Sequence, residues 1–127
     1  MNTFFRLSRS TSAAVLIVFA LLPAVACAHA FPQKSDPAVG ATIAKSPPTV
    51  RIWFNSYLEP LFNKLVVKNA AGKVVSHGKA TVDAKDRSLL EVELPSLPPG
   101  TYHVYWRVTS KDGHHTEGDY TFTVSGH

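Results

Sequence analysis

From residue 29 onward, apolar and polar side chains alternate in short runs that proline and glycine separate. An alternation with period two is typical of strands with one buried face, and the frequent breakers leave little room for long helices. The clearest runs lie at residues 50–54, 64–68, 89–94, 101–109 and 120–124. The sequence therefore predicts an all-β domain.

The run at residues 101–109 is the most regular, and it follows a Pro-Pro-Gly turn. One face of this strand would carry Tyr102, Val104, Trp106 and Val108. The opposite face would carry His103, Tyr105 and Arg107. The last strand repeats the pattern, with Tyr120, Phe122 and Val124 on its inner face. Two strands of this kind are expected to lie in one sheet over a shared core.

The other runs complete the predicted fold. A turn at residues 69–72 is expected to join the strand at 64–68 to a second strand at 73–75 as a hairpin, followed by a turn at 76–78. About seven short strands at intervals of about ten residues favour an immunoglobulin-like Greek-key β-sandwich or barrel. Trp53 and Trp106 both lie within apolar alternation, so we expect both to pack in the core.

Residues 1–28 have the three parts of a secretory signal peptide. Arg6 and Arg9 come first, an apolar run follows at 13–22, and small residues occupy 24–28. Cleavage after Ala28 would leave a domain of residues 29–127; cleavage before Phe31, or lipidation of Cys27, are the alternatives. The apolar run is too short for a permanent membrane anchor, so we expect an exported, periplasmic protein without stable membrane insertion.

Charge and composition narrow the function classes. The formal net charge is +4, and removal of Arg6 and Arg9 would leave +2 on a chain whose basic residues are scattered, which argues against nucleic-acid binding. The only cysteine is Cys27 and the only methionine is Met1, so the processed chain would contain no sulfur and no disulfide. We expect a monomer held together by packing.

Histidines carry the candidate chemistry. Asp112 and His114 are two residues apart in a loop between the two best strands, so both can point to one side. Taken alone, this pair is more typical of a hydrogen-bonded turn in which Asp112 orients His114 than of a metal site. Processing before His29 would add an α-amine and an imidazole that can chelate one metal ion. A nitrogen-rich set with one hard oxygen suits Cu(II) or Ni(II), leaves zinc possible and disfavours Cu(I).

Several motifs resemble the CopC copper-resistance proteins of the bacterial periplasm. They are a His-x7-Pro-x2-Gly opening at residues 29–40, a Pro-x-x-Val-x-Ile-x-Phe strand at 47–54, a Leu-Pro-Pro-Gly-Thr-Tyr-x-Val-x-Trp-Arg-Val-x-Ser-x-Asp-x-His block at 97–114 and a Gly-x-Tyr-x-Phe-x-Val end at 118–124. The resemblance implies a seven-stranded Greek-key fold and one Cu(II) per chain bound by His29, Asp112 and His114. His103 and Glu117 are expected to support this site from a second layer.

The resemblance also implies a function: holding Cu(II) for copper resistance, buffering or delivery to a membrane copper transporter of the CopD type, without enzymatic turnover. Asn55 and Ser56 stand where some members have Glu, and the Met/His-rich Cu(I) loop is absent, so a Cu(II)-only protein is expected. His77, His115 and His127 are expected to be surface residues. The competing hypotheses are a copper-dependent oxidative enzyme with an N-terminal histidine chelate and an immunoglobulin-like interaction module without metal.

Overall fold

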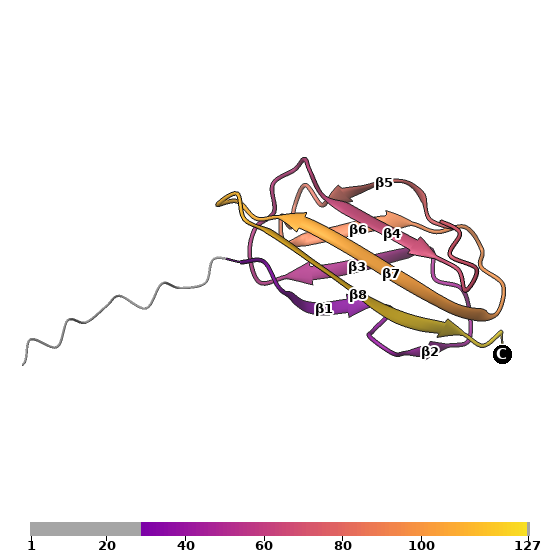
Figure 1. Ribbon diagram of the computed structural model, residues 1–127. Helices are drawn as coiled ribbons and strands as arrows, with labels where there is room; N and C mark the ends of the chain where they lie inside the picture. Colours follow the sequence, from indigo (N-terminus) through magenta and orange to yellow (C-terminus); the bar gives the residue numbers. More distant parts are fainter. Residues whose placement is uncertain (1–28, 127) are drawn as a thin grey trace, which may run out of the picture.

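The structure is a computed structural model that describes residues 29–126. The predictions for the signal peptide, the alternative cleavage sites, Cys27 and His127 concern residues outside this range. The described residues form strands and loops without a helix (Figure 1). The strands are β1 Pro32–Asp36, β2 Thr42–Ile43, β3 Thr49–Phe54, β4 Lys64–Lys68, β5 His77–Val82, β6 Leu89–Glu93, β7 Gly100–Thr109 and β8 His115–Val124.

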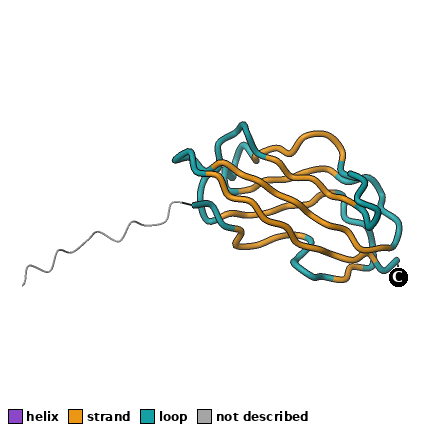
Figure 2. The backbone as a smooth tube through the Cα atoms, viewed as in Figure 1, coloured by secondary structure: helices purple, strands orange, loops and turns teal. Residues whose placement is uncertain are grey.

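The strands form two four-stranded sheets that pack as a sandwich (Figure 2). One sheet has the order β1-β3-β6-β5, and all its neighbours are antiparallel. The other has the order β2-β8-β7-β4, in which only the short β2 runs parallel to its neighbour β8. Because most connections cross from one sheet to the other, strands distant in sequence become neighbours. The predicted all-β sandwich is confirmed.

The core follows the alternation in the sequence. Every second residue is buried from Tyr102 to Val108 in β7 and from Tyr120 to Val124 in β8, and these inner faces are the ones the pattern predicts. The first sheet contributes buried residues of β3 and β6, and Phe54 meets Trp106 edge to face with ring centroids 5.2 Å apart. Residues from both sheets thus interdigitate in one apolar layer.

Two expectations about the strands are wrong, and a third holds only in part. Trp53 is out of phase with the buried Ile52 and Phe54, so it lies on the outer face, where Lys34 Nζ is 4.9 Å from its ring centroid. The predicted hairpin after β4 forms but is short: Lys68 and Val74 form an antiparallel bridge, and Val75 donates its N–H to the Val67 carbonyl at 2.8 Å, but residues 73–75 are not a strand of either sheet. The chain then crosses to the other sheet, and His77 begins strand β5 instead of lying in a turn.

The end of the sandwich where the described chain begins gathers several loops. The turn between β7 and β8 lies at this end (Figure 1). The loop after β3 joins it there, because Leu58 forms a bridge with Ser110 and Lys111 donates its N–H to the Tyr57 carbonyl at 2.9 Å. None of the described residues form a helix long and apolar enough to cross a membrane.

Candidate metal site

His29, the first described residue, lies beside the turn between β7 and β8. Its ring centroid is 4.8 Å from that of His114, and the two rings are nearly perpendicular, at 77°. His29 Nδ1 is buried and has no hydrogen-bond partner within the described residues. A buried ring nitrogen without a partner is costly unless another group satisfies it. The structure therefore brings together two of the predicted site residues, which lie 85 positions apart in the sequence.

The turn that carries Asp112 and His114 is held by its own backbone. Ser110, which is fully buried, donates its N–H to the His114 carbonyl at 2.9 Å, and Gly113 donates its N–H to the Ser110 carbonyl at 2.8 Å. Gly113 has a φ of 88°, a conformation that residues with a Cβ rarely adopt. The backbone here is a tight turn and not the extended segment that the sequence argument assumed, yet the two side chains still meet.

The Asp112 carboxylate has donors on both oxygens. Oδ1 accepts hydrogen bonds from the Ser110 hydroxyl and, at 3.2 Å, from the His114 backbone N–H. Oδ2 lies 2.9 Å from His114 Nδ1. The Ser110 hydroxyl, with His114 second, holds the pKa of Asp112 well below its usual range. The carboxylate is therefore ionised at neutral pH and can serve as an anionic ligand.

The spacing of these atoms is compatible with a metal ion. Two ligands at about 2.0–2.1 Å from one ion and at right angles to each other lie about 2.9 Å apart, which matches the Oδ2–Nδ1 separation. The donors are imidazole nitrogen and carboxylate oxygen, a set that suits tetragonal Cu(II). Within residues 29–126, however, no three His, Cys, Asp or Glu side chains already surround a common point. His29 would need to turn its ring toward the pair.

The two residues after His29 are anchored to both sheets. Thr116 of β8 donates its hydroxyl to the Ala30 carbonyl at 2.7 Å, and the Ala30 side chain is fully buried. Asn55, which follows β3, binds Phe31 twice: its Oδ1 accepts the Phe31 N–H at 2.8 Å, and its own N–H donates to the Phe31 carbonyl at 2.9 Å. In the sequence, Asn55 stands out only as a departure from a family pattern, and nothing there indicates a structural role for Thr116.

The prediction that His103 supports the site is wrong. His103 lies in β7 opposite Lys68 and Thr121, six residues before Thr109, which places it roughly 20 Å along the strand from the turn. Its ring stacks on Tyr105, with the centroids 5.9 Å apart. His103 lies near the start of β7, and the turn follows the other end of the strand, so the length of the strand separates it from the site.

Glu117 also does not support the site. It is exposed on the outer face of β8, opposite Arg107, where it lines a shallow hollow of about 550 Å³ with Lys64 and Arg107. Among the described residues it makes no hydrogen bond or ion pair with the candidate ligands. The alternation of β8 points it away from the layer that Thr116 faces.

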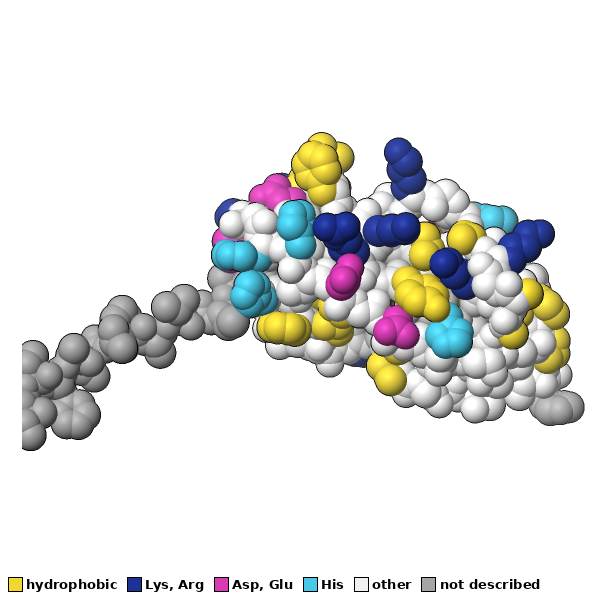
Figure 3. All heavy atoms as spheres, in the orientation of Figure 1, with side chains coloured by type: hydrophobic (Ala, Val, Ile, Leu, Met, Phe, Trp, Pro, Cys, Tyr) yellow, Lys and Arg dark blue, Asp and Glu magenta, His cyan; other side chains and the backbone are white. Residues whose placement is uncertain are grey.

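The other histidines behave largely as expected. His115 is exposed, and its Nδ1 lies 2.9 Å from the Thr109 hydroxyl. His77 is exposed on β5, the outermost strand of its sheet. In the space-filling view, histidine side chains gather at the end of the sandwich where the grey segment begins, close to acidic side chains (Figure 3).

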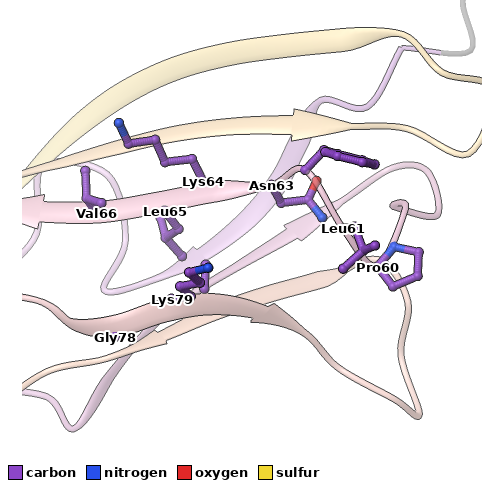
Figure 4. A pocket seen from close by; sticks show the side chains of 10 residues that line it. Pro60, Leu61, Asn63, Lys64, Leu65, Val66, Gly78 and Lys79 are labelled. Atoms are coloured by element: carbon purple, nitrogen blue, oxygen red, sulfur yellow. The ribbon is translucent and has the colours of Figure 1, made fainter.

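The hollow between the edge strands β4 and β5 offers no comparable chemistry. It has a volume of about 470 Å³ and is lined mainly by apolar residues, with Lys64 and Lys79 as its only charged side chains. Figure 4 shows Leu65 and Lys79 facing each other between the two strands, with Lys64 directed away. A hollow without a carboxylate, imidazole or thiol does not bind a divalent metal.

Comparisons with known proteins agree with this fold. A family model described as the CopC domain matches residues 32–125. Copper resistance protein C of Escherichia coli is 34% identical over 107 residues, which cover 78% of this chain and 83% of that protein. Copper transport protein CutJ of Bacillus subtilis (strain 168) is 30% identical over 111 residues; these cover 87% of this chain but 20% of CutJ, so the chain spans about one fifth of that relative's length.

A solved structure shares the architecture. The crystal structure of CopC from Methylosinus trichosporium OB3b matches with a TM-score of 0.72 at 34% identity, over 76% of this chain and 94% of that chain. The family match covers most of the described residues, and the shared architecture agrees with it. The chain belongs to the CopC family.

Proposed function

We propose that this protein binds one Cu(II) ion in the periplasm as cargo, through His29, Asp112 and His114. The observation that carries the proposal is that these three side chains lie at one end of the sandwich, with a 2.9 Å contact between Asp112 and His114 and a His29 ring centroid 4.8 Å from that of His114. His29 Nδ1, which has no hydrogen-bond partner among the described residues, is available as a ligand.

Removal of a signal peptide before His29 supplies the remaining ligand. In the full-length chain the His29 nitrogen is an amide joined to Ala28, whereas a chain that begins at His29 has a free α-amine next to the ring. Amine, two imidazoles and one carboxylate form an N/O set without sulfur, which favours Cu(II) over Cu(I). An open surface site of this kind suits a carrier or buffer of copper without enzymatic turnover.

We also propose that the protein passes copper to, or receives it from, a membrane copper transporter of the CopD type. The relative named copper transport protein CutJ supports this, because a segment like this chain makes up about one fifth of its length. A domain of this family therefore occurs joined to a larger copper transport protein. In our proposal, the separate chain makes the same exchange as a monomer in solution.

The test begins with the full-length chain exported by its own leader and recovered from the periplasm. Its intact mass identifies the first residue, and native mass spectrometry with one equivalent of Cu(II) gives the stoichiometry. We expect a chain starting at His29 with one copper ion. His29→Ala and His114→Ala should each weaken Cu(II) binding by more than about 100-fold, since even partners that only orient ligands cost 10–100-fold.

His77→Ala and His115→Ala are the matched controls, because both remove an exposed histidine outside the site. They should leave the affinity unchanged. A mature chain that begins at Phe31 or carries lipid on Cys27 would remove the chelate and contradict the proposal. If the control variants lost as much Cu(II) affinity as His29→Ala and His114→Ala, Cu(II) would be binding non-specifically to histidine side chains.

A further inference from the structure

Three hydrogen bonds and one buried side chain fix the two residues that follow His29. The Thr116 hydroxyl donates to the Ala30 carbonyl at 2.7 Å. Asn55 forms two hydrogen bonds with the backbone of Phe31: its Oδ1 accepts the Phe31 N–H at 2.8 Å, and its N–H donates to the Phe31 carbonyl at 2.9 Å. The Ala30 side chain is fully buried. Asn55 follows a strand of the first sheet and Thr116 belongs to the second, so these contacts tie the start of the domain to both layers.

This anchoring decides how freely His29 moves in a processed chain. The first residues of a domain are usually poorly ordered unless they are tied down. A mobile His29 would lose backbone and side-chain entropy when it chelates a metal, which lowers the affinity. Here only one peptide unit separates the candidate chelate from a fixed Ala30, so most of that ordering is already present before a metal arrives.

The hydrogen bonds of Asn55 and Thr116 also determine where His29 lies. Thr116 is two residues after His114 in the sequence, and its bond to Ala30 brings the start of the domain beside the turn that carries Asp112 and His114. No hydrogen bond within residues 29–126 joins Asn55 or Thr116 directly to the side chains of the candidate ligands. Their contacts are with the backbone of the residues next to His29.

We propose that Asn55 and Thr116 are positioning residues that preorganise the amine and imidazole of His29 for Cu(II). The inference rests on the proposed function, because it assumes that the mature chain begins at His29 and binds Cu(II) there. Neither residue is a metal ligand in this proposal. Asn55 acts through its amide oxygen, and Thr116 acts through its hydroxyl.

Thr116 allows the cleanest test. Thr116→Val keeps the shape and removes the hydroxyl, whereas Thr116→Ser keeps the hydroxyl. We expect Thr116→Val to weaken Cu(II) binding about five- to tenfold, which is the loss of one hydrogen bond of ordinary strength, and Thr116→Ser to stay within about twofold of the wild type. Thr123→Val is the control, since it removes a hydroxyl bond to Thr101 at the far end of the same strand.

Asn55→Ala should act in the same direction as Thr116→Val. Its control is Asn69→Ala, which removes a half-buried asparagine whose Oδ1 also accepts backbone N–H groups, here those of Ala71 and Lys73. Affinity is measured by competition with a Cu(II) chelator. Electron paramagnetic resonance of the bound ion should change in Thr116→Val and Asn55→Ala, because the His29 donors occupy less uniform positions, and should remain unchanged in both controls.

A measurement without metal separates positioning from general destabilisation. In the copper-free mature protein, the amide of Phe31 should exchange with solvent slowly in the wild type and faster in Asn55→Ala. Amides of Val104 and Phe122 in the core strands should exchange at unchanged rates. Faster exchange throughout the protein would show a structural role and overturn the inference.

The outcomes distinguish this inference from the proposed function. A wild-type mature chain that does not bind Cu(II) contradicts the proposed function itself. In the other outcome, the wild type binds one Cu(II), and Thr116→Val and Asn55→Ala bind it equally tightly with the same resonance spectrum. That result leaves the proposed function intact and overturns only the positioning role.

Discussion

Tyr102 and Tyr120 illustrate how differently two buried hydroxyls can be placed on one face of one sheet. Their side chains are 3% and 8% exposed. The Tyr102 hydroxyl donates to the Pro98 carbonyl, whereas the Tyr120 hydroxyl has no partner of acceptable geometry among the described residues. Burial raises the pKa of both, that of Tyr120 to about 12; the Asp36 charge adds to this shift, and the nearby Ser35 hydroxyl opposes it.

Replacing each tyrosine by phenylalanine should therefore give different results. Tyr120→Phe removes no hydrogen bond and should change the free energy of unfolding by less than about 0.5 kcal/mol, while Tyr102→Phe should cost about 1 kcal/mol. Urea denaturation of the copper-free protein at neutral pH measures both. A larger loss in Tyr120→Phe would reveal a hydrogen bond that this geometry lacks.

Tyr120 also predicts a dependence on alkaline pH. Because its folded-state pKa lies near 12 and an exposed tyrosine has a pKa near 10, its contribution to stability is fully present below about pH 10 and is lost as the pH rises toward 12. Denaturation measured between pH 9 and 12 should show a shallower fall for Tyr120→Phe than for the wild type. Parallel curves would contradict this assignment.

At the scale of elements, the pairing of β7 with β8 depends on a glycine. Gly118 lies directly opposite Trp106, and a Cβ at this position would be 2.6 Å from Trp106 Cζ2. Real Cβ atoms do not approach a ring atom so closely. The indole therefore covers the backbone of β8 while its other contacts, including that with Phe54, belong to the core.

Gly118→Ala should force the indole or the strand to move, at a cost of about 1–3 kcal/mol. Thermal and urea denaturation measure the loss. The Gly118→Ala change should cost less in a Trp106→Phe background, because the smaller ring leaves room for the methyl group. Equal costs in both backgrounds would show that the methyl group does not meet Trp106.

At the scale of the whole molecule, the candidate site combines the start of the domain with a turn between its last two strands. The Leu58–Ser110 bridge and the contacts of Asn55 and Thr116 hold three separate segments together at one end of the sandwich. The loops carry the candidate ligands, and the two sheets fix where those loops lie. The proposed site would therefore require the chain to be both folded and cleaved before His29.

A chain that retains Ala28 in front of His29 tests this dependence. It keeps both imidazoles and the carboxylate but has no free amine on His29. We expect its Cu(II) affinity to fall by at least about tenfold relative to the processed chain, with an unchanged unfolding midpoint for the copper-free protein. Equal affinity would exclude the amine as a ligand while leaving the three side chains as candidates.

Local patterns were sufficient for much of the fold. Alternation with period two identified the inner faces of β7 and β8 because their side chains point alternately to the core and to solvent. It failed for Trp53, whose size favoured a core position although its phase in β3 places it outside. It also missed β1, β2 and β5, which are largely exposed and therefore have no apolar alternation to detect.

For the candidate site, too, some features could be predicted from the sequence and others only from the folded structure. The sequence alone determined the donor types on offer: a histidine at an expected cleavage site, an Asp-x-His segment and no sulfur after residue 28. Only the tertiary structure decided that His29 lies beside His114 and that Asn55 and Thr116 hold the backbone of the residues after His29 between the two sheets. The physical reason is that donor type is a property of single residues, whereas distance between remote residues follows from strand order and register.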